Sequence, residues 1–315
     1  NFMNSGVNQQ IYISNCSTPL PSGSGNITNQ PMLAGIDNPH LLTASPCIDL
    51  GTNIYAYGTD IDGTARIVGG RVDIGCDEFT GGSATGLLAV AIQVEATIVA
   101  PDYVLDFRAD ISGMPSHFAW DIGGTITTNE AIMTSSWPSP GSYPVILTAY
   151  NTDYPGGVAA TVTVQVLSQT GHVWAAGSHV SPFDTWAKAA TNIQAAIDVS
   201  PYGGIVLVTN GVYNSGGRTK DELMTRVVLD KPVTVISVNG PNATFITGNG
   251  PMGTSAVRCA YLVSKAVLSG FTLTNGFTLS FGITIPARCG GGAYLDGGGT
   301  LSNCVVVANQ SSLYG

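Results

Sequence analysis

Residues 266–273, with the sequence AVLSGFTL, are one of four short apolar runs that recur between Gly203 and Gln310. The others are IVLV at 205–208, VTVISV at 233–238 and LSNCVVV at 301–307. Their starts lie roughly thirty residues apart, and Gly, Asn and Pro separate them without a helical pattern. Strands that recur at a fixed period predict a solenoid, in which each turn buries its apolar side against the next turn.

A finer alignment sharpens this prediction. Residues 267–271 (VLSGF) align with residues 300–304 (TLSNC) and with residues 12–16 (YISNC). Equivalent positions of a parallel β-helix stack above one another, and small or apolar residues suit the interior column. We therefore expect an all-β chain with a right-handed parallel β-helix; an antiparallel sandwich of unrelated strands is the alternative for this segment.

The composition limits the partners of the chain. Only 10% of the residues are charged, the net charge is −9, and the 11 Lys and Arg residues do not cluster, so nucleic acid is not expected. No apolar run approaches the roughly 20 residues that span a membrane. Asn1 is neither an initiator Met nor the start of a signal peptide, and we expect a processed product or a piece of a longer chain. A Gly-rich, hydrophobic composition with few charged residues suits an extracellular or cell-surface β protein.

Three spaced motifs lie within residues 1–80: SPCIDLG at 45–51, TDIDGTAR at 59–66 and GGRVDIGCDEF at 69–79. They resemble the closing segment of bacterial surface β-helix proteins of the choice-of-anchor Q type, whose pattern is SPxIDxG, then DxDGxxR, then VDIGAxE. Cys76 stands where that family usually has Ala. The resemblance implies that residues 1–80 are the C-terminal coil and closing segment of a β-helix.

Residues 86–168 follow a Gly- and Ser-rich linker and change character. Short alternating runs predict an Ig-like β-sandwich, with strands expected at 91–99, 104–109, 117–121, 143–150 and 160–167. The sequences FAWDIGGT at 118–125 and PGSYPVILTAYN at 140–151 resemble the polycystic-kidney-disease (PKD) domain, whose pattern is WDFGDG followed by PGxYxVxLTAxN. Trp120 is the expected core residue, and the resemblance implies a spacer or weak binding module.

Residues 172–315 are expected to hold one short capping α-helix and the N-terminal coils of a β-helix. Asp184 is the expected N-cap. The apolar face, at helical spacing, carries Trp186, Ala189, Ala190, Ile193, Ala196 and Ile197. Such a helix covers the open end of a solenoid, which otherwise invites edge pairing. ATNIQAAID at 190–198 and LSGFTLTNG at 268–276 resemble the start of pectin-lyase-like β-helices in the same surface-protein group.

The order of these segments predicts assembly, because the chain begins with the end of a β-helix and ends with the start of one. If Gly315 is joined to Asn1, the separation of Cys304 from Cys16 across the join is close to the period of the coils. We therefore expect a structural repeat unit of a head-to-tail filament or surface fibre, whose copies complete one another's β-helix. A fragment of an ordinary large surface protein is the alternative. The expected junction residues are Ile11, Ile13, Cys16, Leu301, Cys304 and Val306.

Catalysis is not expected. Polysaccharide-cleaving β-helices pair carboxylates on one coil face, whereas the acidic residues between Gly203 and Gly315 are scattered along the sequence. They are Asp221, Glu222, Asp230 and Asp296. A non-enzymatic protein without a cofactor is the main prediction, and binding or cleavage of an extracellular polysaccharide is the alternative.

One acidic group is a candidate ion site, and it contains Asp60, Asp62, Asp73, Asp77 and Glu78. Of these, Asp60, Asp62 and Asp73 are the candidate ligands for a calcium ion, since carboxylate oxygens at alternating positions suit that ion. The alternative is a turn at residues 62–63, with Asp60 or Asp73 paired to a nearby arginine.

The chain has six cysteines, and none lies between residues 77 and 258. Cys47 and Cys76 are the candidates for a disulfide in an oxidising compartment. Buried free thiols are the alternative.

Overall fold

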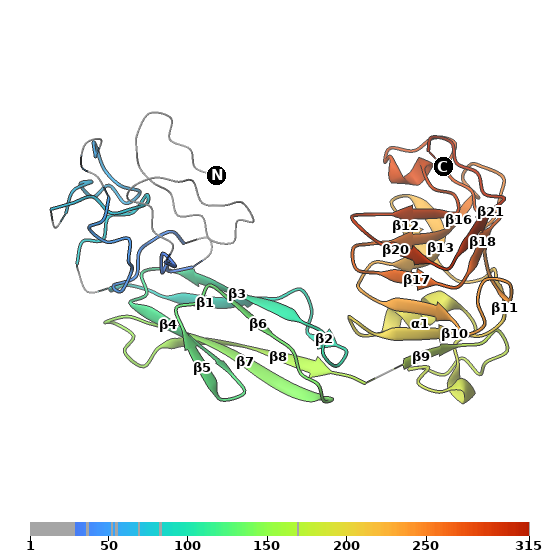
Figure 1. Ribbon diagram of the computed structural model, residues 1–315, viewed down its shortest axis with the longest axis horizontal. Coiled ribbons are helices and arrows are strands. Elements are labelled where there is room, and N and C mark those ends of the chain that lie inside the picture. The colour runs from blue at the N-terminus through green and yellow to red at the C-terminus, as the bar shows by residue number, and fades with distance from the viewer. Residues whose placement is uncertain are drawn as a thin grey trace. The chain divides into compact units, whose positions relative to one another are not determined.

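The computed structural model describes residues 29–314 except 36, 37, 52, 54, 55, 69, 82, 83 and 169 (Figure 1). The described chain divides into two units. The first holds the described residues before Ile98 together with Val104–Ser136 and Ser142–Val164; the second holds Ile98–Tyr103, Trp137–Gly141 and the chain from Gln165 onward. None of the helices in the described ranges has the length and apolarity needed to cross a membrane. The predicted boundaries at 80–86 and 168–172 stay predictions.

A β-sandwich forms where alternating strands were expected. Its strands are β1 (Ala89–Gln93), β2 (Ile98–Val99), β3 (Leu105–Ser112), β4 (His117–Ile122), β5 (Thr125–Thr128), β6 (Ile132–Ser135), β7 (Gly141–Tyr150) and β8 (Val158–Val166). They form two sheets, in the orders β1-β3-β6 and β2-β8-β7-β4-β5. The sequence did not predict β5 and β6, because their residues are exposed or half-buried and show no strong in–out alternation.

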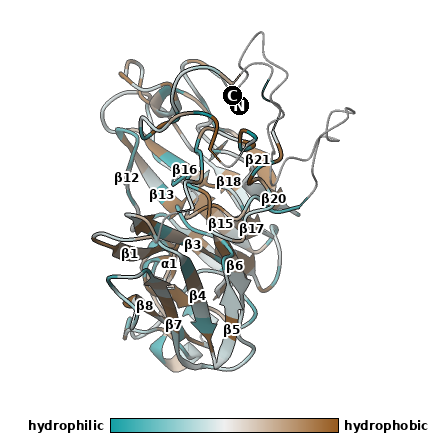
Figure 2. Ribbon diagram, turned by 90° about the vertical axis from the view of Figure 1, so that its left-hand side faces the viewer, coloured by the Kyte–Doolittle hydropathy of each residue, from teal (hydrophilic) through white to brown (hydrophobic). Residues whose placement is uncertain are grey.

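The core of the sandwich is built by that alternation. Every second residue of β3 is buried, including Phe107 and Ala109, and Figure 2 shows hydrophilic and hydrophobic residues mixed along β4. Trp120 is fully buried, lies opposite Leu147 in the ladder, and donates its indole N–H to Glu130 O at 2.7 Å. Trp120 is therefore the core residue that the sequence predicted.

The second unit is a parallel β-solenoid of three sheets. The first sheet has β9 (Thr170–Val173), β10 (Ile205–Val208), β14 (Thr234–Ser237), β17 (Val267–Ser269) and β20 (Thr300–Ser302). The second has β11 (Gly211–Tyr213), β15 (Thr244–Thr247), β18 (Thr272–Thr274) and β21 (Val305–Val307). The third has β12 (Arg218–Lys220), β13 (Leu223–Leu229), β16 (Val257–Leu262) and β19 (Ala293–Leu295), and all its pairings except β12–β13 are parallel.

The register of the coils confirms the sequence alignment residue by residue. Val267 pairs with Thr300 and Leu268 with Leu301, which is the offset that aligned VLSGF with TLSNC in the sequence. On the preceding coils, Val206 pairs with Val235 and Val235 pairs with Leu268. These three fully buried residues form a column in the interior of the solenoid. The solenoid therefore forms because apolar residues return to the same interior position once per coil.

A short α-helix, α1 (Ile193–Val199), packs on β9, β10 and β13 at the first coils, as the capping prediction requires. Its start was predicted wrongly. The Asn192 side chain accepts the Ala195 N–H at 2.9 Å and is the N-cap, whereas Asp184 pairs with Lys188 at 3.0 Å. Residues Trp186–Lys188 form a separate 3-10 turn, η2. The helix cannot be continuous because Ala190 is extended and bridges to the first sheet.

The described part of residues 29–80, called the closing segment below, has isolated bridges in place of strands. Its small core contains Leu41, Cys47 and Ile74. Gly51 of the SPCIDLG motif is required here, because a Cβ at that position would lie 2.5 Å from Val72 O. A strand at 11–16 was also expected, and it lies outside the described residues.

Candidate functional site

The three aspartates predicted to bind calcium do not form one ligand set. Both oxygens of Asp73 accept backbone N–H groups, from Asp49 at 2.7 Å and from Phe79 at 2.6 Å. Both oxygens of Asp60 are occupied in the same way. The N–H groups that it accepts belong to Asp62, Thr64 and Glu78. These carboxylates hold turns together because the turns lack strand partners for their N–H groups.

The expected turn at residues 62–63 is present, but the expected arginine pairs are not. Arg66 donates to Gly75 O at 3.1 Å, and Arg71 donates to Gly51 O at 2.8 Å. No ion pair joins either arginine to Asp60 or Asp73 among the described side chains. Both guanidinium groups satisfy backbone carbonyls instead.

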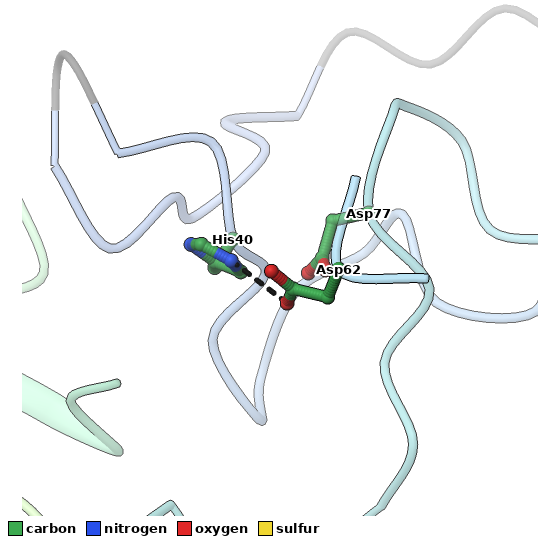
Figure 3. A group of neighbouring side chains, drawn as sticks. All are labelled: His40, Asp62 and Asp77. Atoms are coloured by element: carbon green, nitrogen blue, oxygen red, sulfur yellow. Dashed lines mark hydrogen bonds and ion pairs between the residues drawn. The ribbon is translucent and has the colours of Figure 1, made fainter. Parts of the chain in front are cut away.

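Asp62 faces a different set of partners. His40 Nε2 lies 2.9 Å from Asp62 Oδ2, and Asp77 lies beside them, so that one ligand atom from each residue falls within 4.8 Å of the others (Figure 3). Asp77 is 5% exposed and accepts the Leu41 N–H at 2.7 Å. Burial raises the pKa of Asp77, and the neighbouring carboxylates of Asp60 and Asp62 raise it further against the opposing effect of His40.

This group lines a cavity of about 740 Å³ in the first unit. The walls come from the closing segment and from the end of β3, including Ile111 and Gly113. The ionisable residues of the lining are His40, Asp62, Asp77 and Glu78. The lining of the cavity therefore combines acidic side chains with apolar ones such as Leu41 and Ile111.

The predicted disulfide is not formed. Cys47 is buried against Leu41 and Ile74, whereas Cys76 is exposed, and both are free thiols. In the solenoid, burial raises the pKa of Cys259 to about 12, so this thiol stays protonated.

A second cluster lies on the third sheet of the solenoid. The rings of Tyr261 (β16) and Tyr294 (β19) stack with centroids 5.4 Å apart and an interplanar angle of 22°. Lys220 Nζ lies 5.3 Å from the centroid of Tyr261. The Tyr261 hydroxyl donates to Asp296 Oδ2 at 2.7 Å and also interacts with Asp221. We call these five residues the tyrosine cluster.

A buried arginine supports the tyrosine cluster. Arg258 is fully buried, and its Cζ lies 5.3 Å from the Tyr294 centroid and 5.9 Å from the Tyr261 centroid. The guanidinium donates to the carbonyls of Pro286, Cys289 and Gly290. Burial lowers the pKa of Arg258 to about 10, against the nearby Asp221. Cation–π contact with two rings compensates part of that burial.

Sequence reasoning missed this cluster, although a signal was present. AYLV at 260–263 and AYLD at 293–296 repeat at the same spacing that relates the other stacked coil positions. The acidic residues Asp221 and Asp296 are scattered along the sequence, and the fold brings both to the hydroxyl of Tyr261. Asp221 lies near this hydroxyl because it stands in the turn of the hairpin that joins β12 to β13.

The described half of the predicted assembly junction lies in the last described coil. Leu301 and Cys304 pack partly buried against the solenoid core, and Val306 is 53% exposed. The other half, Ile11, Ile13 and Cys16, lies outside the described residues.

The fold is assigned here from the strand pairing, and not from comparisons with known proteins. Neither a family model nor a curated protein matches the sequence. One similar solved structure is a carbohydrate-binding module of the β-sandwich superfamily, 22% identical over 28% of this chain and 37% of that chain, with a TM-score of 0.24. Another is the family 28 exopolygalacturonase of Yersinia enterocolitica, 13% identical over 57% of this chain and 41% of that chain, with a TM-score of 0.22. The chain spans less than half the length of either structure.

Proposed function

We propose that this protein is an extracellular, non-enzymatic polysaccharide-binding protein that binds sugar at the tyrosine cluster. The observation that supports this proposal is the stacked pair Tyr261 and Tyr294 with two carboxylates beside it on one coil face. Aromatic faces give apolar contact area, and a few converging polar groups fix the orientation of a ligand. A purely structural coil surface would instead carry small polar residues such as Asn, Thr and Ser.

The exposed members of the cluster are the ones that would contact the sugar. Tyr261 is 2% exposed and supports its neighbour, whereas Tyr294 is half-buried and Asp296 is exposed. Burial and the carboxylates of Asp296 and Asp221 raise the pKa of Tyr261 above its usual range, so its hydroxyl remains a donor at neutral pH. Both carboxylates therefore already interact with the Tyr261 hydroxyl, and this favours a role in sugar binding over a role as general acid or base in cleavage.

The test is the affinity for soluble polysaccharides, measured by affinity electrophoresis and calorimetry with an acidic polymer (polygalacturonate) and a neutral one (xyloglucan). Tyr294→Ala should weaken binding at least about tenfold, equivalent to about 1.4 kcal/mol. Tyr314→Ala is the matched control, because Tyr314 is 67% exposed in the same unit and outside the cluster. Equal binding by Tyr294→Ala and the wild type, or no binding to either polymer, would contradict the proposal.

The surroundings of the site fit the surface proteins that the sequence resembles. Their closing segment and PKD-like spacer correspond here to residues 1–80 and to the β-sandwich. In this proposal the sandwich is a spacer, as the PKD-like resemblance implies, and calcium at the closing segment is not required.

Head-to-tail assembly is a second candidate function, supported by the edge of the last described coil. Within the described residues no strand follows β19, β20 or β21 in its sheet. The side chains of Val305, Val306 and Val307 are 43%, 53% and 50% exposed. Unpaired strand edges invite pairing with another chain, and a second copy carries the matching sequence at 12–16.

Sedimentation velocity and electron microscopy test this assembly. Val306→Lys should reduce it, because a charge on an edge strand opposes pairing. Val212→Lys is the control, since Val212 is similarly exposed (56%) on β11, which lies at the other end of the same sheet. Monomers at all concentrations, or equal effects of the two variants, would refute the junction.

A further inference from the structure

The orientation of the Asn38 amide determines which nitrogen of His40 carries hydrogen. Asn38 Nδ2 donates to Ile111 O at 3.2 Å and to Gly113 O at 3.0 Å. Asn38 Oδ1 is thereby turned toward His40, where it contacts Nδ1 and the backbone N–H. Since Oδ1 can only accept, His40 Nδ1 must donate.

The other ring nitrogen then faces an acceptor as well. His40 Nε2 lies 2.9 Å from Asp62 Oδ2, and a neutral ring with its hydrogen on Nδ1 directs a lone pair toward this carboxylate. A positive species between the two atoms, either a proton or a metal ion, is required to make this contact favourable. A histidine that donates its far N–H to an oxygen and offers the near nitrogen to a cation is the usual arrangement of a metal ligand.

Asp77 and the cavity supply an independent reason to expect a metal ion. Asp77 Oδ2 is held by the Leu41 N–H, and its ligand atom lies within 4.8 Å of those of His40 and Asp62. The lining of the cavity contains three carboxylates and neither Lys nor Arg. The cavity, of about 740 Å³, also has room for water ligands.

We propose that His40 Nε2 and the carboxylates of Asp62 and Asp77 bind a divalent transition-metal ion of the zinc class. One imidazole nitrogen and two carboxylate oxygens suit Zn²⁺, which takes mixed nitrogen and oxygen ligands. Calcium prefers six to eight oxygen ligands. The carboxylate oxygens of Asp60 and Asp73 already accept backbone N–H groups. The ion ties the loops at residues 38–41, 60–64 and 77 together.

Calorimetry of the full chain with ZnCl₂ and with CaCl₂, together with thermal unfolding, tests the site. We expect one Zn²⁺ per chain, a rise in the melting temperature with added Zn²⁺, and much weaker binding of Ca²⁺. His40→Gln and Asp62→Asn should each lower the Zn²⁺ affinity at least about 100-fold. Asp62 is partly exposed, so the Asp62→Asn variant remains informative if His40→Gln fails to fold.

Two controls separate this site from other metal-binding groups. His117→Gln removes a histidine stacked on Tyr150 in the same unit and should leave the affinity unchanged. Cys76→Ser removes the exposed thiol, and the Co²⁺ complex should show no thiolate charge-transfer band. Absence of Zn²⁺ binding, binding that survives His40→Gln or Asp62→Asn, binding that is lost with Cys76, or equal affinity for Ca²⁺ would overturn the proposal.

Discussion

The solenoid and the closing segment are stabilised in opposite ways. In the solenoid, backbone N–H and C=O groups pair along parallel ladders, and columns such as Val206, Val235 and Leu268 fill the interior. In the closing segment, isolated bridges replace ladders, and carboxylates of residues 60, 73, 77 and 78 accept the backbone N–H groups. One region satisfies its backbone by repetition and the other by individual side chains.

The comparison teaches where each region is vulnerable. A solenoid coil loses stability when interior volume is removed, whatever the identity of the residue. The closing segment loses stability when a single acceptor is removed, because its N–H donor is then buried without a partner. The four predictions below separate these two behaviours.

The largest effect is expected at the cap of the solenoid. Ile193 is 1% exposed in α1, and Ile193→Asp buries an unpaired charge there. The loss of stability should be on the order of 5 kcal/mol, and chemical denaturation of the whole chain measures it. An unchanged unfolding midpoint would contradict the burial of α1 in the core of the solenoid.

A gradient along the interior column sharpens the comparison. Leu268→Ala should cost about 2–5 kcal/mol, because Leu268 is fully buried between two coils. Leu301→Ala should cost clearly less, because Leu301 is only partly buried in the last described coil. The same denaturation experiment compares them. Equal losses would mean that another element covers the last coil.

Asp60→Asn should destabilise the closing segment while the solenoid is unaffected. Both its carboxylate oxygens accept N–H groups, so the new amide must face a donor, at a cost of about 1–3 kcal/mol. Hydrogen exchange of residues 29–80 measures the loss. The control is Asp49→Asn, since Asp49 is exposed and its φ of 55° suits Asn. Equal protection in the two variants would argue against stabilisation by individual acceptors.

The smallest effect is a pH dependence confined to the closing segment. Burial raises the pKa of Asp73, Asp77 and Glu78 in the folded chain. The folded state therefore holds protons more tightly, so their contribution to stability is greatest below their ordinary values of 3.8 and 4.5 and declines as the pH rises through the raised pKa values. Hydrogen exchange corrected for intrinsic rates should show greater protection of residues 29–80 near pH 4 than near pH 7. The opposite trend would mean that hydrogen bonding outweighs burial.

The two regions also differ in what the sequence predicts. The register of Leu268 on Leu301 follows directly from the sequence, because periodic residues reveal which positions stack. The same period places Tyr261 beside Tyr294. Burial of Trp120 was predictable from the alternation of β4.

The His40 group could not be predicted in this way. His40 and Asp62 meet through loops that have no period. Asn38 donates hydrogen bonds that fix one of these loops, and Asp60 accepts N–H groups that fix the other, but neither bond is marked by a period in the sequence. The start of α1 was missed for a similar reason, since a single bridge at Ala190 decides where the helix can begin.

The uniform offset of the last described coil has a consequence for how such a chain can change in evolution. Val267 with Thr300, Thr272 with Val305 and Ala260 with Ala293 are separated by the same number of positions, so all three sheets share one offset. Duplication or loss of one such period in the gene would therefore give every remaining strand a neighbour that it already fits. Each such event would change the length of the solenoid by one strand spacing, about 4.8 Å. The length of the solenoid can therefore change in steps of one coil, and a change in repeat number alters its reach without redesigning any coil.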